Sequence, residues 1–169
     1  YPFVDYTKCT KCGLCEHICP INKTYESNKF NYAYIAKNKN SKTRINSSSG
    51  GLFYLLAKAV INQEGVVFGA AFVNMKVKHI LVDKINDINK LQGSKYVQSE
   101  LKDTFEKVNQ YLTEGKKVLF SGTPCQVQGL KSFLKKDFNN LLCVDFICHG
   151  VPSPKVFAQY CNELEKRRS

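Results

Sequence analysis

Four cysteines near the start of the chain have a spacing that suits metal ligation. Cys9, Cys12, Cys15 and Cys19 are followed directly by Pro20, which gives the pattern C-x2-C-x2-C-x3-C-P. Thiolates at this spacing hold the irons of a 4Fe-4S cluster, and the fourth cysteine often ligates a neighbouring cluster. A zinc knuckle is the alternative, but overlapping C-x2-C steps suit a cubane better than the paired arms of a zinc site.

The cysteines define a ferredoxin-type module over residues 1–21, which is too short to bury a core of its own. The cluster must therefore supply the folding energy of this module, as zinc does for small fingers. His17 lies inside the run, but four thiolates already complete a ligand set, so His17 is expected at the surface or in packing. Residues 22–46 are rich in Asn, Lys, Ser and Tyr and are predicted to form a linker with one short strand near residues 32–35.

A second candidate site begins where serines and glycines precede an apolar helical pattern. Ser49, Gly50 and Gly51 lie at this point, and the helical pattern ends near Asn62. Backbone N–H groups at the start of a helix, together with the positive end of its dipole, can bind a phosphate. Such residues also cap helices for purely structural reasons, and both interpretations stay open.

A loop further along the chain has a complementary set of groups. Gly93, Ser94, Lys95 and Tyr96 combine backbone freedom, a hydroxyl, a cation and an aromatic ring. This set can anchor a phosphorylated flat cofactor. The same residues would also form an ordinary loop.

The hydrophobic periodicity predicts an α/β fold, in which the small ferredoxin-like cysteine module precedes a mixed or parallel sheet with βα repeats. His79 alternates into a strand and is expected near the surface rather than as a catalytic base, whereas Cys143 and Cys161 are expected in the core. The predicted strands span residues 66–73, 77–82, 117–121 and 141–147, and the predicted helices span residues 52–62, 85–91, 101–115, 126–135 and 154–166.

The last two strands are each followed by a loop that carries a cysteine. Gly122, Thr123, Pro124 and Cys125 form the first loop, and Cys148 opens the second. Because the carboxyl ends of parallel strands share one edge of a sheet, the two thiols are expected on the same edge. Two thiols there could ligate a metal, form a redox pair or be small buried residues, and the residues alone leave all three open.

Composition and charge limit the partners. The 169 residues include 25 Lys and Arg against 14 Asp and Glu, a formal charge of +11. Lysines scattered over solvated faces are the first interpretation of this excess, and attraction of an acidic electron-carrier partner or an anionic cofactor is the alternative. Neither a zinc-finger spacing nor a basic helix with stacking aromatics is present, so no nucleic-acid partner is expected. No apolar run reaches about 18 residues, so no transmembrane segment is expected. Eight cysteines without a signal-peptide pattern indicate a reducing compartment, the cytoplasm.

Taken together, the motifs resemble those of the coenzyme F420 hydrogenase/dehydrogenase beta-subunit family. The resemblance covers nearly the whole chain and implies an iron-sulfur flavoprotein oxidoreductase. Such a protein passes electrons between 4Fe-4S clusters and FAD, and then to a deazaflavin (coenzyme F420) or another acceptor. The segments that carry the resemblance are Cys9–Pro20, Ser49–Gly51, Gly93–Ser99, Gly122–Gln126 and Cys148–Pro154.

The resemblance also implies roles for individual residues. Cys125 and Cys148 would be two ligands of a further 4Fe-4S cluster. The residues expected to bind the flavin cofactor are Ser49, Gly50, Gly51, Gly93, Ser94, Lys95 and Tyr96, with Gly122, Thr123 and Pro124 as further cofactor-binding residues.

Two departures from the family pattern indicate a fragment. Family members with the ferredoxin module usually carry two cysteine runs, whereas this chain has one, and no downstream C-x2-C follows Cys161. Residues 1–21 are therefore expected to be the second half of the module. Residues 47–169 are expected to be an α/β flavin and electron-transfer domain that is truncated at its C-terminus.

The predicted chemistry is electron transfer rather than acid-base catalysis, and no catalytic residue is assigned. Clusters supply one-electron steps and FAD accumulates two electrons. The expected partner is a redox protein or subunit of the ferredoxin or hydrogenase/dehydrogenase type. The alternative, from a different class, is a non-enzymatic ferredoxin-like electron carrier or docking module. A metal-dependent transferase or structural zinc protein is disfavoured because the sequence has no constellation of carboxylates and histidines.

Overall fold

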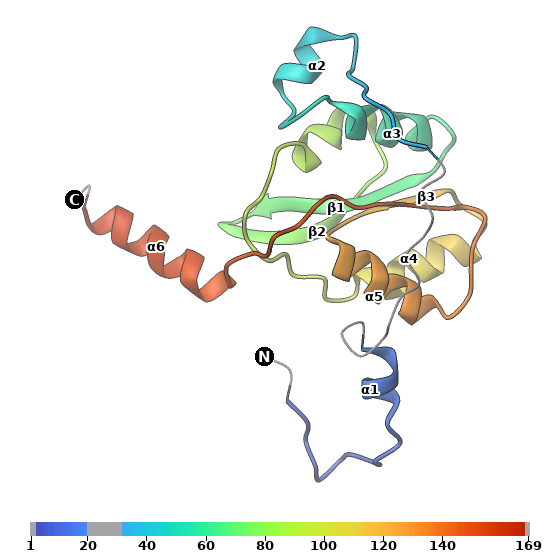
Figure 1. Ribbon diagram of the computed structural model, residues 1–169, viewed down its shortest axis with the longest axis vertical. Helices are drawn as coiled ribbons and strands as arrows, with labels where there is room; N and C mark the ends of the chain where they lie inside the picture. The colour runs from blue at the N-terminus through green and yellow to red at the C-terminus, as the bar shows by residue number, and fades with distance from the viewer. Residues whose placement is uncertain (1–2, 20–31, 168–169) are drawn as a thin grey trace.

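The computed structural model describes residues 3–19 and 32–167, whose centre is a mixed four-stranded sheet (Figure 1). The strand order is β2-β1-β3-β4. Strands β1, β3 and β4 run parallel, whereas β1 and β2 pair antiparallel as a hairpin. The strands are β1 (Val66–Val73), β2 (Lys76–Val82), β3 (Val118–Ser121) and β4 (Leu141–Val144).

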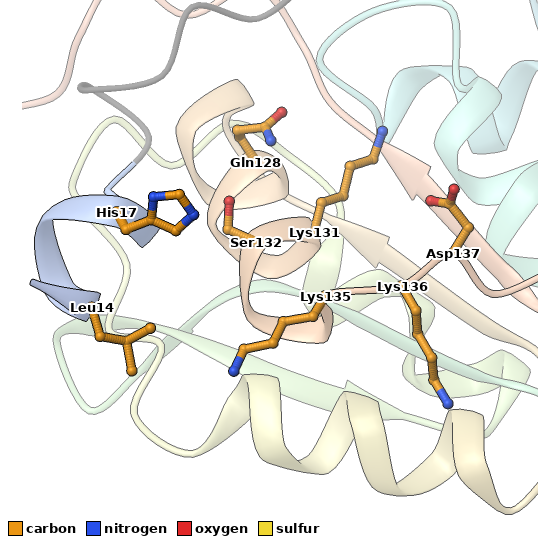
Figure 2. Close-up of a pocket in the computed structure, with 8 residues that line it drawn as sticks. All are labelled: Leu14, His17, Gln128, Lys131, Ser132, Lys135, Lys136 and Asp137. Carbon is orange, nitrogen blue, oxygen red and sulfur yellow. The ribbon is translucent and has the colours of Figure 1, made fainter. Parts of the chain in front are cut away.

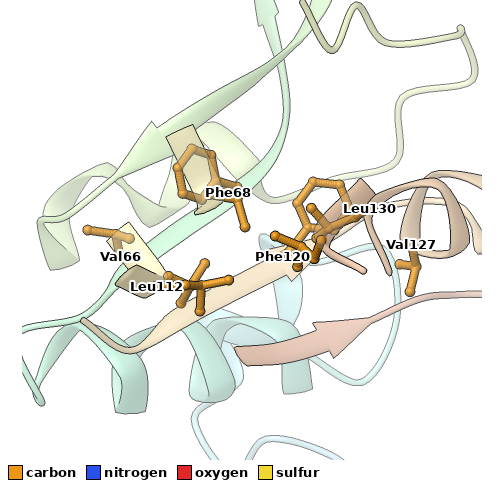
Figure 3. Packing of buried hydrophobic residues seen from close by; sticks show 9 residues of the cluster. Val66, Phe68, Leu112, Phe120, Val127 and Leu130 are labelled. Carbon is orange, nitrogen blue, oxygen red and sulfur yellow. The ribbon is translucent and has the colours of Figure 1, made fainter. Parts of the chain in front are cut away.

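Helices cover both faces of the sheet because alternate residues of β1 and β3 point to opposite sides. Phe68 and Phe120 face α4 (Thr104–Thr113) and α5 (Pro124–Leu134), where Leu112 and Leu130 complete a buried cluster (Figure 3). Their neighbours in the strands face α3 (Leu52–Ile61) and the 3-10 helix η2 (Ile85–Leu91) in a second cluster. The predicted α/β class, with its parallel βα repeat, is confirmed.

Local capping explains why α5 begins two residues earlier than predicted. Thr123 and Gln126 form a capping box, and Pro124 occupies the first turn, where its missing N–H has no cost. The predicted end of β4 was wrong, because the strand ends at Val144 rather than at residue 147. The strand residues are only partly covered, and Ile147 beyond the strand is 88% exposed.

The predicted linker over residues 22–46 contains a helix that the sequence did not indicate. Helix α2 (Ser41–Ile45) is capped by Asn40, whose side chain accepts the N–H of Thr43 at 2.9 Å. No strand forms over residues 32–36, so the predicted short strand is wrong there; residues 20–31 lie outside the described part. The buried Asn38 joins this segment to the next, because its N–H donates to the Gly50 carbonyl at 2.7 Å.

Helices α1 (Leu14–Ile18) and α6 (Pro154–Lys166) project from the part of the structure that surrounds the sheet (Figure 1). Helix α1 belongs to the cysteine module and contacts α5. Helix α6 has the predicted bounds but buries none of its residues. Cys161 therefore lies in a surface groove, and the prediction that it belongs to the core was wrong. None of the helices within the described residues is long and apolar enough to cross a membrane.

Candidate cofactor and cluster sites

The cysteine module presents its thiols on an irregular backbone that is turned by two left-handed residues. Lys11 and Gly13 have φ values of 55° and 71°. The turn directs the N–H of Lys11 to Cys9 Sγ at 3.4 Å. Hydrogen bonds from the Leu14 backbone and then the Thr10 side chain lower the pKa of Cys12. The lowered pKa of Cys12 favours the thiolate that a metal requires.

All four thiols of the module are free, with Cys9 and Cys19 half-buried and Cys12 and Cys15 exposed. Within the described residues, no group of three or more His, Cys, Asp or Glu side chains is gathered closely enough to hold a metal ion. The donor chemistry fits a 4Fe-4S cluster, because four thiols are available and N–H groups are directed at two of them.

A groove of about 550 Å³ separates α1 from α5 (Figure 2). Leu14 and His17 of α1 form one side, and the other side is formed by Gln128, Lys131, Ser132, Lys135, Lys136 and Asp137. His17 is exposed and points across the groove toward α5, which agrees with the surface or packing role expected for it.

Helix α5 therefore connects the cysteine module to the Cys125 loop. Cys125 lies in the first turn of α5, and Gln128 and Ser132 of the same helix face the module. At 1.5 Å per residue, these two residues lie about 5 and 11 Å along the helix axis from Cys125. The two cysteine sites thus share one rigid element.

The two segments predicted to bind a flavin lie against one another. The N–H of Ser94 donates to Ser48 Oγ at 2.7 Å, and the Gln92 amide donates to Ser47 Oγ at 3.0 Å. Gly51, with φ of 75°, starts α3 in a left-handed conformation that favours glycine. A side chain at Gly50 would place its Cβ 2.8 Å from the Ala36 carbonyl oxygen.

Lys95 and Tyr96 occupy different environments in this loop. The Lys95 ammonium donates to the carbonyls of Leu91 and Gln92 at 2.9 and 2.8 Å, and so caps the end of η2. Burial lowers the pKa of Lys95 to about 8. Tyr96 is 79% exposed, so its ring is open to a ligand. The loop therefore offers N–H groups, hydroxyls and an aromatic face, which suit a flavin nucleotide, while the cation stabilises the protein itself.

The loops after β3 and β4 emerge from paired residues. Ser121 and Val144 are register partners, and Cys125 and Cys148 each lie four residues further on. Both sulfurs make local hydrogen bonds: Cys125 Sγ lies 3.0 Å from Thr123 Oγ1, a pair in which either atom can donate, and the Gly150 N–H donates to Cys148 Sγ at 3.4 Å. The structure therefore starts both loops at the same edge of the sheet.

His79 is buried, so the prediction that it lies near the surface was wrong. The side chain is only 9% exposed, and the backbone of Glu100 pairs with β2 beside it. Its Nε2 lies 3.0 Å from the Ser121 carbonyl oxygen, to which it donates, and its ring stacks on Phe120 with centroids 5.3 Å apart. Burial lowers the pKa of His79, although the hydrogen bond to Ser121 opposes this effect.

The sequence analysis assigned no role at this edge of the sheet to two polar residues, His79 and Gln126. His79 pairs with Ala70, which lies on the same face of the sheet as Phe68 and Phe120. The ring therefore stacks on Phe120, near the end of the strand that leads into the Cys125 loop. The signal for Gln126 was its position three residues after Thr123, which is the spacing of a capping box.

Comparison with known proteins supports both parts of the chain. Residues 2–22 match the family model of the 4Fe-4S binding domain, which confirms the ferredoxin-type module. Residues 115–168 match the family model for the C-terminal part of the coenzyme F420 hydrogenase/dehydrogenase beta subunit. No curated protein matches the chain.

A solved structure resembles the fold. It is a chain of the F420-reducing [NiFe] hydrogenase complex from Methanosarcina barkeri, studied with xenon derivatization, and the TM-score is 0.60 at 16% identity. The match covers 76% of this chain and 49% of that chain, so the present chain spans about half the length of its structural relative. At this identity the likeness shows the fold alone.

Proposed function

We propose that this chain is an oxidoreductase subunit that transfers electrons between a 4Fe-4S cluster and a flavin. It belongs to the coenzyme F420 hydrogenase/dehydrogenase beta-subunit family, whose model matches residues 115–168. One observation carries the proposal. The cysteine module contacts α5 across a shared groove, and the first turn of α5 begins at the edge of the sheet from which the Cys125 and Cys148 loops start. Electron transfer needs such proximity between redox centres.

The cysteine module would hold the first cluster through Cys9, Cys12, Cys15 and Cys19, and Cys125 and Cys148 would be ligands at a second. A 4Fe-4S cluster supplies one-electron steps when it is bound. The protein contributes hydrogen bonds to sulfur from the N–H of Lys11 in the module and from the N–H of Gly150 at the sheet edge, and the Thr123 hydroxyl can donate to Cys125 once that thiol has lost its proton. Such bonds stabilise negative charge on sulfur and so favour the reduced state.

The flavin, which we propose to be FAD, would bind between the start of α3 and the loop after η2. Ser49, Gly50 and Gly51 provide backbone N–H groups near the positive end of the α3 dipole. Gly93, Ser94 and Tyr96 provide a loop fixed by Ser48 and an exposed ring for contact with a flat group. Lys95 positions this loop, and Gly122, Thr123 and Pro124 complete the proposed site from the edge of the sheet.

The acceptor that we propose is a deazaflavin such as coenzyme F420, or another two-electron acceptor. The structural relative is part of an F420-reducing hydrogenase complex, which supports this class of acceptor and a redox protein or subunit as the partner. The proposal keeps residues 1–21 as the cluster module, residues 22–46 as the connection and residues 47–169 as the flavin domain. The free thiols suit a reducing compartment, the cytoplasm.

Iron and flavin content test the proposal. The full chain is reconstituted anaerobically with iron, sulfide and FAD, and then desalted. We expect Cys9→Ser to lower bound iron and to bleach the broad visible absorption, while Cys143→Ser, which changes a half-buried thiol of β4, retains both. Full iron and absorbance in Cys9→Ser would overturn the cluster assignment.

Flavin content separates the proposal from its alternative. An iron-sulfur flavoprotein retains FAD after desalting. A ferredoxin-like carrier or docking module would retain iron and no FAD, and that result would replace the flavoprotein interpretation.

A further inference from the structure

Residues 98–100, here called the junction strip, contact both loops that carry a cysteine at the edge of the sheet. The N–H of Gln98 lies 3.4 Å from the Pro152 carbonyl oxygen, in the loop that follows Cys148. Ser99 Oγ accepts a hydrogen bond at 2.8 Å from the Gln126 amide, which is next to Cys125. Two consecutive residues of the strip thus hold two loops that are distant in sequence.

The junction strip is itself fixed to the sheet. The N–H of Glu100 donates to the Val77 carbonyl at 2.9 Å, and the N–H of His79 donates to the Glu100 carbonyl at 3.0 Å. The His79 ring then donates from Nε2 to the Ser121 carbonyl at 3.0 Å, at the end of β3. The strip therefore has a defined place relative to the strand that leads into the Cys125 loop.

Gln126 is held in one orientation because both ends of its amide are bonded. Oε1 accepts the N–H of Thr123 at 3.0 Å, which caps α5, and Nε2 donates to Ser99. The space around this amide is narrow, since a Cβ added to Gly122 would lie 3.0 Å from Gln126 Oε1. Because the Gln126 amide bonds both to the start of α5 and to Ser99, it fixes the position of the α5 cap relative to the junction strip.

We propose that Ser99 and Gln126 are positioning residues that hold the Cys125 loop beside the Cys148 loop. Neither residue would touch a metal; each acts through the loops. The inference rests on the proposed function, because holding two thiols in place before metal binds increases metal affinity only if the thiols are ligands. The arrangement itself exists in the protein chain and is measurable without iron or flavin.

Cross-linking of the two thiols measures this arrangement directly. The reduced, metal-free full chain is treated with a short bis-maleimide, digested with trypsin, and the linked peptides are identified by mass spectrometry. Cys125 is released between Lys117 and Lys131, and fragment ions distinguish Cys148 from Cys143 on the other peptide. We expect a Cys125–Cys148 link in the wild type.

Substitutions at the strip test its role. Ser99→Ala removes the bond to Gln126 and leaves the α5 cap intact, so the linked fraction should fall about threefold to tenfold, the ratio expected for one hydrogen bond. Gln126→Ala should lower the linked fraction at least as much. Ser99→Thr keeps the hydroxyl and should restore the wild-type fraction. Ser132→Ala is the matched control, because its hydroxyl, on the same helix, has no partner among the described residues.

The outcomes are separable from those of the iron and flavin experiment. All variants are compared at a temperature where their circular dichroism equals that of the wild type, so that general destabilisation appears in Tm and not in the linked fraction. Equal linking in Ser99→Ala and the wild type, or no Cys125–Cys148 link in the wild type, overturns the inference. A chain that links normally but binds neither iron nor FAD would overturn the proposed function and leave this inference standing.

Discussion

The backbone N–H of Ser94 donates to Ser48 Oγ at 2.7 Å, and this contact joins two loops separated by α3, the β1–β2 hairpin and η2. Each loop taken alone is consistent with an ordinary cap or turn. Their contact places the helix start, the serine hydroxyls and the exposed ring of Tyr96 in one region. Because the two motifs lie in one region, a single nucleotide could contact both of them.

Removal of the Ser48 hydroxyl should loosen this region. We expect Ser48→Ala to lower the free energy of unfolding by about 1 kcal/mol and to weaken FAD binding about fivefold, the effects of one ordinary hydrogen bond. Urea denaturation and a flavin fluorescence titration measure the two quantities. Ser41→Ala, on the exposed surface of α2, is the control and should change neither. Unchanged FAD binding in Ser48→Ala would argue against a flavin at this contact.

His79 should make the stability of the protein depend on pH. Its pKa is below the usual 6.5 in the folded state because the ring is buried, so the unfolded chain binds more protons as the pH falls through 6.5. The wild type should therefore lose stability relative to His79→Gln between about pH 7 and pH 5. The glutamine keeps an amide donor for the Ser121 carbonyl but does not titrate. Parallel pH profiles for the two proteins in urea denaturation would contradict the prediction.

Lys95 should also make the stability of the protein increase with pH, but in a higher pH range than His79. Its folded pKa of about 8 lies below the unfolded value of 10.5, so between these values the unfolded chain again binds more protons. The stability of the wild type relative to Lys95→Met should therefore increase as the pH rises from 8 to 10. Lys58→Met, at an exposed position of α3, should show no such trend relative to the wild type. A difference that stays constant or falls over this range would show that the buried amine does not lose its proton there.

The core beneath the Cys125 loop should be sensitive to truncation. Leu130 is fully buried where α5 packs on the sheet, and Leu130→Ala should cost about 2–5 kcal/mol through lost burial and the cavity left behind. Leu142→Ala, at a position 41% exposed on β4, should cost less than about 1 kcal/mol. Chemical denaturation of both variants provides the measurement. Equal losses would mean that the two positions contribute equally to the core.

The sequence predicted those elements whose hydrophobic period was long and uninterrupted. The apolar run of β1 and the amphipathic pattern of α6 gave the observed bounds, and the parallel repeat of β3, α5 and β4 followed from their order. Spacing alone identified the cysteine module, because ligand geometry restricts where thiols can stand. Hydrophobic periodicity and cysteine spacing depend on residues that are close in sequence, so they can be recognised without knowledge of the tertiary contacts.

The remaining features depend on contacts between distant residues. Alternation within a strand suggests a surface position for His79. It cannot show that the ring stacks on Phe120 and bonds to the Ser121 carbonyl, since both partners lie on β3. The composition of its loop suggests a phosphate partner for Lys95, whereas its carbonyl partners lie on the preceding turn and depend on the geometry of η2. Helix α2 depends on an Asn40 cap in a segment whose composition is typical of a linker.

Strand β4 ends the sheet and pairs only with β3 among the described residues. The N–H and C=O groups on its outer side therefore form an open template for another extended chain. With Leu142 partly exposed beside it, this edge is where copies of the chain would begin to aggregate at high concentration. A lysine introduced by Leu142→Lys should protect the edge, much as charged residues protect exposed edges in natural sheet proteins.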